Sequence, residues 1–238
     1  MGDRWLDVGR HRRKRIDSYD SCRPRHIGIN LIDTAPVYGF GVSEEIVGKA
    51  IEERGHREKV FIATKVGLEW HNGSVSRNSS RDRIRKEVED SLRRLRTDYI
   101  DIYQVHWPDL AVPIEDTAQT MQALRKEGLI RAIGVSNYSP EQMNQFMSVS
   151  ELHTVQPPYN LFERQIDRDV LPFVREKNLS AFAYGPLCRG LLRCDRTRSS
   201  PATTSASPIP NFNRRASHNI WRRSSNWTIW RENDMESA

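Results

Sequence analysis

Short apolar runs recur every 20 to 40 residues along the middle of this chain, with helical patterns between them. The runs are 29–33, 60–65, 99–106, 131–137, 153–156 and 180–184. Strands that alternate with helices predict βα units and a parallel sheet. A closed (β/α)8 barrel needs eight such units. The sequence therefore predicts an α/β fold of the TIM-barrel type that is incomplete, with six recognisable βα units.

The segments between the runs carry helix signals. A helix is expected over 44–54, with Ser43 as its N-cap and Glu44 and Glu45 in its first turn, where the helix dipole favours negative charge. Apolar residues at helical spacing predict another helix over 84–95. Further helices are expected near 115–127, after the capping box and proline of 139–142, and over 166–174.

Both ends of the chain break this pattern. The net charge of +6 belongs to residues 1–27 and 193–238, because the middle of the chain is slightly acidic. Residues 193–238 are rich in Ser, Arg, Pro and Asn, and such a composition buries too little apolar area to offset the entropy of ordering it. We expect an atypical basic segment over 1–27, a barrel core over 28–192 and an atypical tail over 193–238, both ends poorly ordered. The abrupt loss of pattern favours the hypothesis that both ends are read out of frame.

Charge and cysteine content exclude several classes of partner. The sequence pI of about 9.4 and the basic run 10–15 would suit phosphates, but no aromatic interleaving or reader motif accompanies them, so no nucleic-acid partner is expected. No apolar run approaches the ~20 residues of a membrane span. Cys22, Cys188 and Cys194 show no metal-ligand spacing, so we expect no metal site and a reducing, cytoplasmic compartment.

Candidate functional residues follow four of the apolar runs. Asp33, Lys65 and His106 each end a run, and the pair Ser136–Asn137 ends a fourth. In a barrel of parallel strands the chemistry lies at the carboxyl ends of the strands, so these side chains are expected to converge. Taken singly, each also has an ordinary structural explanation, as a turn residue, a solvated strand end or a core histidine.

The motifs around these residues resemble the aldo-keto reductases. They are DTAPVYG at 33–39, Lys65 after VFIAT, QVHW at 104–107, GVSN at 134–137 and VQPPYN at 155–160. Their order and spacing match that family over residues 28–192. The resemblance implies a (β/α)8 barrel that binds a nicotinamide cofactor, usually NADPH, and reduces aldehydes and ketones to alcohols. By this resemblance the first and eighth strands of the family barrel are missing or replaced.

The resemblance places the catalytic tetrad of the family on Asp33, Tyr38, Lys65 and His106. Tyr38 would donate a proton to the carbonyl oxygen as hydride adds to the carbon. The Lys65 ammonium would lower the pKa of that phenol, and Asp33 would keep the ammonium charged. His106 would donate a ring N–H that orients the carbonyl oxygen.

The same resemblance supplies a cofactor site. Ser136, Asn137 and Gln156 would hydrogen-bond the nicotinamide carboxamide, and Tyr184 would stack on its ring. The expected contacts of the pyrophosphate are Leu187, Arg189 and Gly190. Nothing after Leu192 matches the segment that binds the adenosine end in the family, so the choice of NADPH over NADH rests on the family alone. Trp70 and Trp107 are candidates for the substrate pocket.

Three functions remain open from the sequence. The first is an NAD(P)H-dependent reductase of small carbonyl compounds. The second is a non-catalytic or defective relative that binds cofactor weakly or serves a regulatory role, because missing first and eighth strands would leave two sheet edges unpaired. The third is a Schiff-base aldolase that uses Lys65 as its nucleophile.

Overall fold

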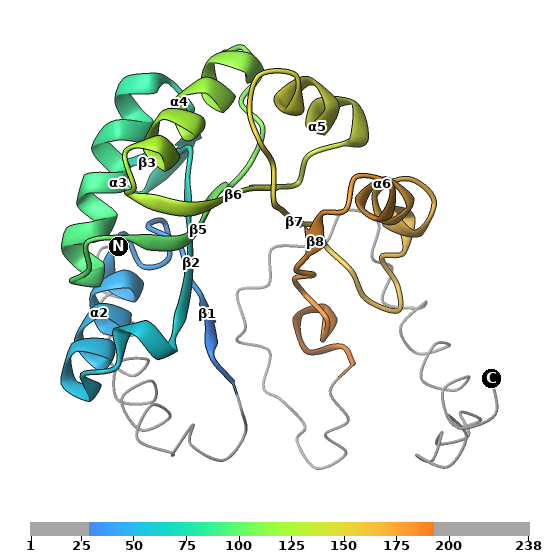
Figure 1. The fold of residues 1–238 in the computed structure, drawn as a ribbon. Helices are drawn as coiled ribbons and strands as arrows, with labels where there is room; N and C mark the ends of the chain where they lie inside the picture. The colour runs from blue at the N-terminus through green and yellow to red at the C-terminus, as the bar shows by residue number, and fades with distance from the viewer. Residues whose placement is uncertain (1–28, 193–238) are drawn as a thin grey trace. The chain divides into compact units, whose positions relative to one another are not determined.

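A curved parallel sheet forms the centre of the fold, and helices lie along its outer face (Figure 1). The computed structural model describes residues 29–192, within which the sheet has six strands in the order β1-β2-β5-β6-β7-β8. The strands are β1 (Leu31–Asp33), β2 (Phe61–Val66), β5 (Ile100–Val105), β6 (Ile130–Ser136), β7 (Thr154–Gln156) and β8 (Ser180–Ala181). The six predicted strands are therefore confirmed. The expectations for 1–27 and 193–238 lie outside the described residues.

Five α-helices cover this sheet in the described range. They are α2 (Val42–Arg54), α3 (Arg81–Leu95), α4 (Ile114–Lys126), α5 (Pro140–Met147) and α6 (Val170–Glu176). Short 3-10 turns occur at η2 (Arg57–Lys59), η3 (Gln165–Asp167) and η4 (Cys188–Gly190). The capping box of α5 is confirmed, since Ser139 and Gln142 each bond the other's backbone N–H. None of the helices in this part of the chain is long and apolar enough to cross a membrane.

Two helix predictions need correction. The helix expected from residue 44 begins at Val42, and its N-cap is Gly41 in a left-handed conformation with φ 99°. Ser43 therefore lies inside the helix, and its hydroxyl hydrogen-bonds the hydroxyl of Thr34 at 2.8 Å. The single helix expected over 166–174 is divided into η3 and α6.

A hairpin that the sequence analysis missed follows β2 directly. It joins β3 (Leu68–His71) to β4 (Ser74–Arg77) as an antiparallel pair. Its turn residues Asn72 and Gly73 have φ angles of 49° and 81°. An Asn-Gly pair with both φ angles positive is the signature of a two-residue hairpin turn, so the sequence did carry the signal.

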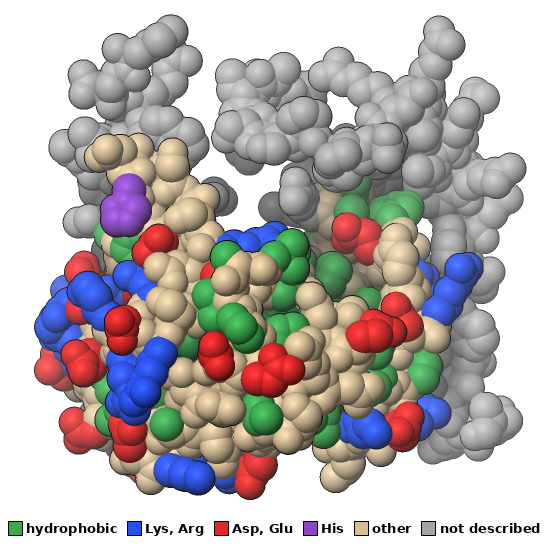
Figure 2. Space-filling view, turned by 90° about the horizontal axis from the view of Figure 1, so that it is seen from above, with side chains coloured by type: hydrophobic (Ala, Val, Ile, Leu, Met, Phe, Trp, Pro, Cys, Tyr) green, Lys and Arg blue, Asp and Glu red, His purple; other side chains and the backbone are tan. Residues whose placement is uncertain are grey.

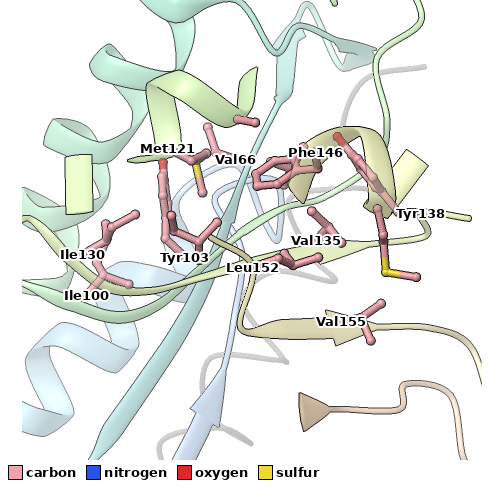
Figure 3. Close-up of a cluster of buried hydrophobic side chains, with 14 of the residues drawn as sticks. Val66, Ile100, Tyr103, Met121, Ile130, Val135, Tyr138, Phe146, Leu152 and Val155 are labelled. Carbon is pink, nitrogen blue, oxygen red and sulfur yellow. The ribbon is translucent and has the colours of Figure 1, made fainter. Parts of the chain in front are cut away.

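The main apolar core lies between the sheet and the helices. Figure 3 shows Tyr103 of β5, Met121 of α4 and Phe146 of α5 among the side chains of this core, and all three are fully buried. On the face drawn in Figure 2, acidic and basic side chains lie interspersed.

Alternation along the strands decides which side chains face the barrel interior. Thr64 of β2 points outward and donates to Glu44 of α2, so its neighbour Lys65 points inward. Lys65 lies in register with Gln104 of β5, and Gln104 with Gly134 of β6. The inner face of the sheet is therefore polar near its carboxyl end.

Candidate active site

The buried Lys65 and the partly exposed Asp33 form an ion pair across β1 and β2. The Lys65 ammonium donates to Asp33 Oδ1 at 3.0 Å, to Asp33 Oδ2 at 2.9 Å and to the Thr34 carbonyl oxygen at 2.9 Å. Lys65 is 1% exposed. Burial lowers the pKa of Lys65 below its usual value, and the charge of Asp33 acts in the opposite direction. Three acceptors thus match the three ammonium protons.

Tyr38 lies beside this pair, in the loop between β1 and α2. The Lys65 Nζ atom is 5.1 Å from the centroid of the Tyr38 ring. The His106 ring meets the same phenol ring edge-on, with 5.9 Å between the centroids and 83° between the planes. The structure therefore brings together all four residues on which the resemblance places the tetrad.

The pKa of Tyr38 differs from the sequence expectation. It is raised to about 12, first because the phenol is partly buried, and then because the charges of Asp33 and Tyr184 disfavour a phenolate. The net shift of this pKa is therefore opposite in direction to the lowering expected from Lys65. Asp33 accepts two of the ammonium protons, and its negative charge offsets that of the lysine.

His106 follows β5, and its backbone N–H donates to the Val66 carbonyl oxygen at 2.8 Å. Burial, and then the charge of Lys65, lowers the pKa of His106 to about 4. The imidazole is therefore neutral at pH 7. A neutral imidazole carries one ring N–H, which can donate to a carbonyl oxygen without adding charge to the site.

Ser136, Asn137, Gln156 and Tyr184 form a hydrogen-bonded chain beside these residues. The Tyr184 hydroxyl donates to Asn137 Oδ1 at 2.8 Å, and Asn137 Nδ2 donates to Ser136 Oγ at 3.0 Å. Ser136 Oγ donates to the Gln156 carbonyl oxygen at 2.8 Å. Asn137 has a left-handed φ of 64°, which asparagine tolerates better than most residues. Four of the predicted cofactor residues are thus neighbours.

The turn after β8 holds the other predicted cofactor residues. Leu187 is exposed, and its carbonyl oxygen accepts from the N–H of Gly190 at 2.9 Å. Gly190 has a φ of 96°, which favours glycine. The side chain of Arg189 lies outside the described part of the structure. A role for this turn in binding pyrophosphate stays a prediction.

The predicted pocket tryptophans lie on the hairpin and directly after His106. Trp70 of β3 packs against Phe40, with 5.6 Å between the ring centroids. The Arg77 guanidinium lies 5.2 Å from the Trp107 ring centroid. Sequence reasoning missed Phe40, which is half-exposed and only two residues from Tyr38.

A buried carboxylate behind β2 was also missed. Glu44 accepts from the Thr64 hydroxyl at 2.6 Å and from Arg94 Nε at 2.7 Å, and it is 0% exposed. The sequence alone places Glu44 only in the first turn of α2, where the helix dipole favours negative charge. The usable signal was Thr64, a polar residue in an apolar strand at a position that faces the helices.

Comparison with known proteins decides the family. A model described as the Aldo/keto reductase family matches residues 25–227. This chain belongs to the aldo/keto reductase family. The match confirms the resemblance carried by the five motifs, and it extends beyond the core expected over 28–192.

Two relatives show how similar the chain is to other members of the family. It is 61% identical over 165 residues to the aldo-keto reductase YhdN of Bacillus subtilis strain 168, covering 69% of this chain and 50% of YhdN. It is 40% identical over 184 residues to the NADH-specific methylglyoxal reductase of Escherichia coli K12, covering 72% of this chain and 56% of that protein. The chain spans about half the length of these relatives.

Solved structures of family members match the fold. The glycerol dehydrogenase AKR11B4 of Gluconobacter oxydans has a TM-score of 0.72 and 53% identity, covering 79% of this chain and 59% of that one. An aldo-keto reductase of Klebsiella pneumoniae in complex with NADPH has a TM-score of 0.60 and 37% identity, covering 68% of this chain and 54% of that one. The prediction of an incomplete barrel of the TIM type is confirmed by these matches and by the curved six-stranded sheet.

Proposed function

We propose that this chain reduces aldehydes or ketones to alcohols with a nicotinamide cofactor. The observation that supports this most directly is the convergence of Tyr38, Lys65 and His106 at the carboxyl ends of neighbouring strands. The cofactor supplies hydride when it is bound. The residues of this chain then have to hold the carbonyl, supply a proton and accommodate the charge that develops on oxygen.

Tyr38 is the proposed proton donor. With a pKa of about 12 its phenol stays protonated at neutral pH. An alkoxide is more basic than a phenolate, so the phenol can give up its proton as negative charge develops on the substrate oxygen. His106, neutral at pH 7, donates its ring N–H to the same oxygen and fixes its position. Lys65 supplies a fixed positive charge beside the phenol.

The side chains proposed for the nicotinamide end fit a primary carboxamide. Gln156 Nε2 has a second hydrogen beyond the one donated to Asp33. Asn137 Oδ1 and Ser136 Oγ each accept one hydrogen bond and keep a further lone pair. A carboxamide needs one donor for its oxygen and acceptors for its amino group, and this set supplies both. The ring of Tyr184 is partly exposed, as a stacking surface has to be.

NADPH is the proposed cofactor. The similar protein of Klebsiella pneumoniae was solved with NADPH, whereas the similar protein of Escherichia coli is named NADH-specific. Titration of both reduced cofactors against the chain, followed by quenching of protein fluorescence, tests the choice. Tighter binding of NADH would overturn it.

A cytoplasmic location, expected from the cysteine content, belongs to the same proposal.

Oxidation of NADPH with a panel of aldehydes tests the reaction. The unaltered chain should turn over, and Tyr38→Phe should lower kcat on the order of a hundredfold or more, because general acid catalysis contributes that much. Tyr138→Phe is the matched control, since this phenol lies among the apolar side chains of the core. Binding of NADPH without turnover of any aldehyde would favour the non-catalytic alternative. Equal rates for Tyr38→Phe and the unaltered chain would overturn the role of Tyr38.

A further inference from the structure

We propose that Glu44 is a positioning residue that holds Lys65 and Tyr38 in place from the outer side of β2. The inference rests on the proposed reductase function, because it assigns Glu44 to the same site. Glu44 does not touch the site itself, and acts through Thr64 and through the first turn of α2.

The first connection runs through β2. Thr64 and Lys65 are consecutive, so their side chains point to opposite faces of the sheet. Thr64 donates its hydroxyl proton to Glu44 Oε1 at 2.6 Å, and Lys65 donates to Asp33 on the inner face. Glu44 thereby fixes the backbone of β2 at the position next to the lysine.

The second connection runs through the start of α2. The Ser43 N–H donates to the Tyr38 carbonyl oxygen at 3.2 Å, and the Gly41 N–H donates to the Pro36 carbonyl oxygen at 2.6 Å. The Ser43 hydroxyl pairs with Thr34, whose carbonyl oxygen accepts from Lys65. Movement of the first turn of α2 would therefore move the loop that carries Tyr38.

Arg94 of α3 anchors Glu44 from the other side. Its Nε donates to Glu44 Oε2 at 2.7 Å, and its Nη2 donates to Glu87 Oε1 at 2.9 Å. Glu44 and Glu87 are both fully buried. Removing one partner of a buried pair leaves the other charge uncompensated, so rigid placement of these groups is expected.

The charge of Glu44 acts in the same direction as these contacts. Together with Asp33 it favours the charged form of Lys65, against the effect of burial. The other titratable groups that face Lys65 are Tyr38 and His106. Loss of the Glu44 charge should therefore make the lysine easier to deprotonate.

Glu87 offers a matched control. It shares Arg94 with Glu44 and is equally buried, but it lies on α3 and its hydrogen bonds and ion pairs in the described range go to Arg94 and Arg83. A variant of Glu87 should lower stability through Arg94 without disturbing β2. The decisive comparison is therefore Glu44→Gln against Glu87→Gln, with Thr64→Val as a third variant that keeps the Glu44–Arg94 pair.

The experiment measures kcat, the KM for NADPH and the pH dependence of kcat for the full chain and each variant, together with urea unfolding. Glu44→Gln should lower kcat on the order of tenfold to a hundredfold at unchanged KM, as expected for displaced catalytic groups. On the basic side of the pH profile, kcat of Glu44→Gln should begin to fall at a lower pH than kcat of the unaltered chain. Thr64→Val should change kcat in the same direction, and Glu87→Gln should leave kcat and the pH profile unchanged.

A readout without turnover separates this inference from the proposed function. The pH at which the Lys65 ammonium titrates can be followed by NMR of the lysine side chains, with Lys65→Met for assignment. Glu44→Gln should shift that titration to lower pH, and Glu87→Gln should shift it less. Absence of reductase activity in the unaltered chain would defeat the proposed function and leave this test in place. Equal titration and equal kcat losses in the two variants would overturn the role of Glu44. If Glu44→Gln does not fold, an unchanged kcat in Thr64→Val would overturn it.

Discussion

The side-chain amide of Gln156 donates to Asp33 Oδ1 at 3.1 Å, joining residues that lie 123 positions apart. Asp33 also accepts from Lys65, so a single carboxylate oxygen is shared by an ammonium and an amide. This contact connects the proposed proton-transfer residues to the proposed nicotinamide-binding residues. A substitution of Gln156 should therefore affect both proton transfer and cofactor binding.

Replacing Gln156 tests that connection. Gln156→Leu removes a hydrogen bond to a charged group, which contributes about 1.5 to 3 kcal/mol. We expect the KM for NADPH to rise on the order of tenfold, and kcat to fall as Asp33 loses one of its partners. Steady-state kinetics with a fixed aldehyde measures both constants. A rise in KM with kcat unchanged would show that Asp33 does not need this contact.

Acid should destabilise the chain through His106. Its pKa is about 4 in the fold against 6.5 when unfolded, so the unfolded state binds the extra proton between these values. The neutral imidazole makes its full contribution to the free energy of unfolding above about pH 6.5. That contribution is lost as the pH falls toward 4, and the loss is at most about 3 kcal/mol. Between pH 7 and pH 4.5, the free energy of unfolding measured with urea should fall less for His106→Gln than for the unaltered chain. An equal loss would assign the acid sensitivity to other groups.

Asp101 should be a strong determinant of stability. This buried carboxylate accepts from Arg57 Nη2 at 2.6 Å, from Arg131 Nη1 at 3.2 Å and from the Ile62 N–H at 3.0 Å. Asp101→Asn should lower the free energy of unfolding by about 3 kcal/mol, as expected for a broken buried pair. Glu52→Gln, which breaks the exposed pair with Arg96, should cost under about 1 kcal/mol. Equal costs in urea unfolding would contradict this ranking.

Gly48 should tolerate no side chain. A Cβ atom there would lie 2.3 Å from the Arg94 carbonyl oxygen and 2.7 Å from the carbonyl carbon of Leu95, both backbone atoms of α3. Gly48→Ala should therefore lower the free energy of unfolding by about 3 kcal/mol despite the better helix propensity of alanine. Lys49→Ala, on the exposed side of the same helix, is the control. A neutral or stabilising Gly48→Ala would mean that α2 and α3 can separate at no cost.

The convergence of the site could be predicted because it follows from local signals. Asp33, Lys65 and His106 each end or follow an apolar strand, and parallel strands bring their carboxyl ends to one edge. The Asn72–Gly73 turn was equally readable and was overlooked. In contrast, Ser43 looked like an N-cap because its residue type favours that position. The left-handed Gly41 takes the position instead, and that conformation depends on the path of the loop from β1.

Interactions between distant segments could not be predicted in the same way. Glu44 and Arg94 are 50 positions apart, and no periodicity links them. The pKa of Tyr38 depends first on how far the fold buries the phenol and then on how close the charge of Asp33 lies, and both are set by the three-dimensional structure. The residue types were therefore readable from the sequence, and their electrostatic balance was not.

The placement of the Lys65 protons has a consequence for isotope measurements. All three match acceptors on Asp33 and Thr34, so the lysine can act as a static charge and has no proton to pass on without breaking a hydrogen bond. If the phenol of Tyr38 supplies the proton, only one solvent-exchangeable proton is transferred in the chemical step. The rate in mixtures of light and heavy water should then vary linearly with the deuterium fraction. A relay through the lysine would transfer more than one proton and would make that plot curved.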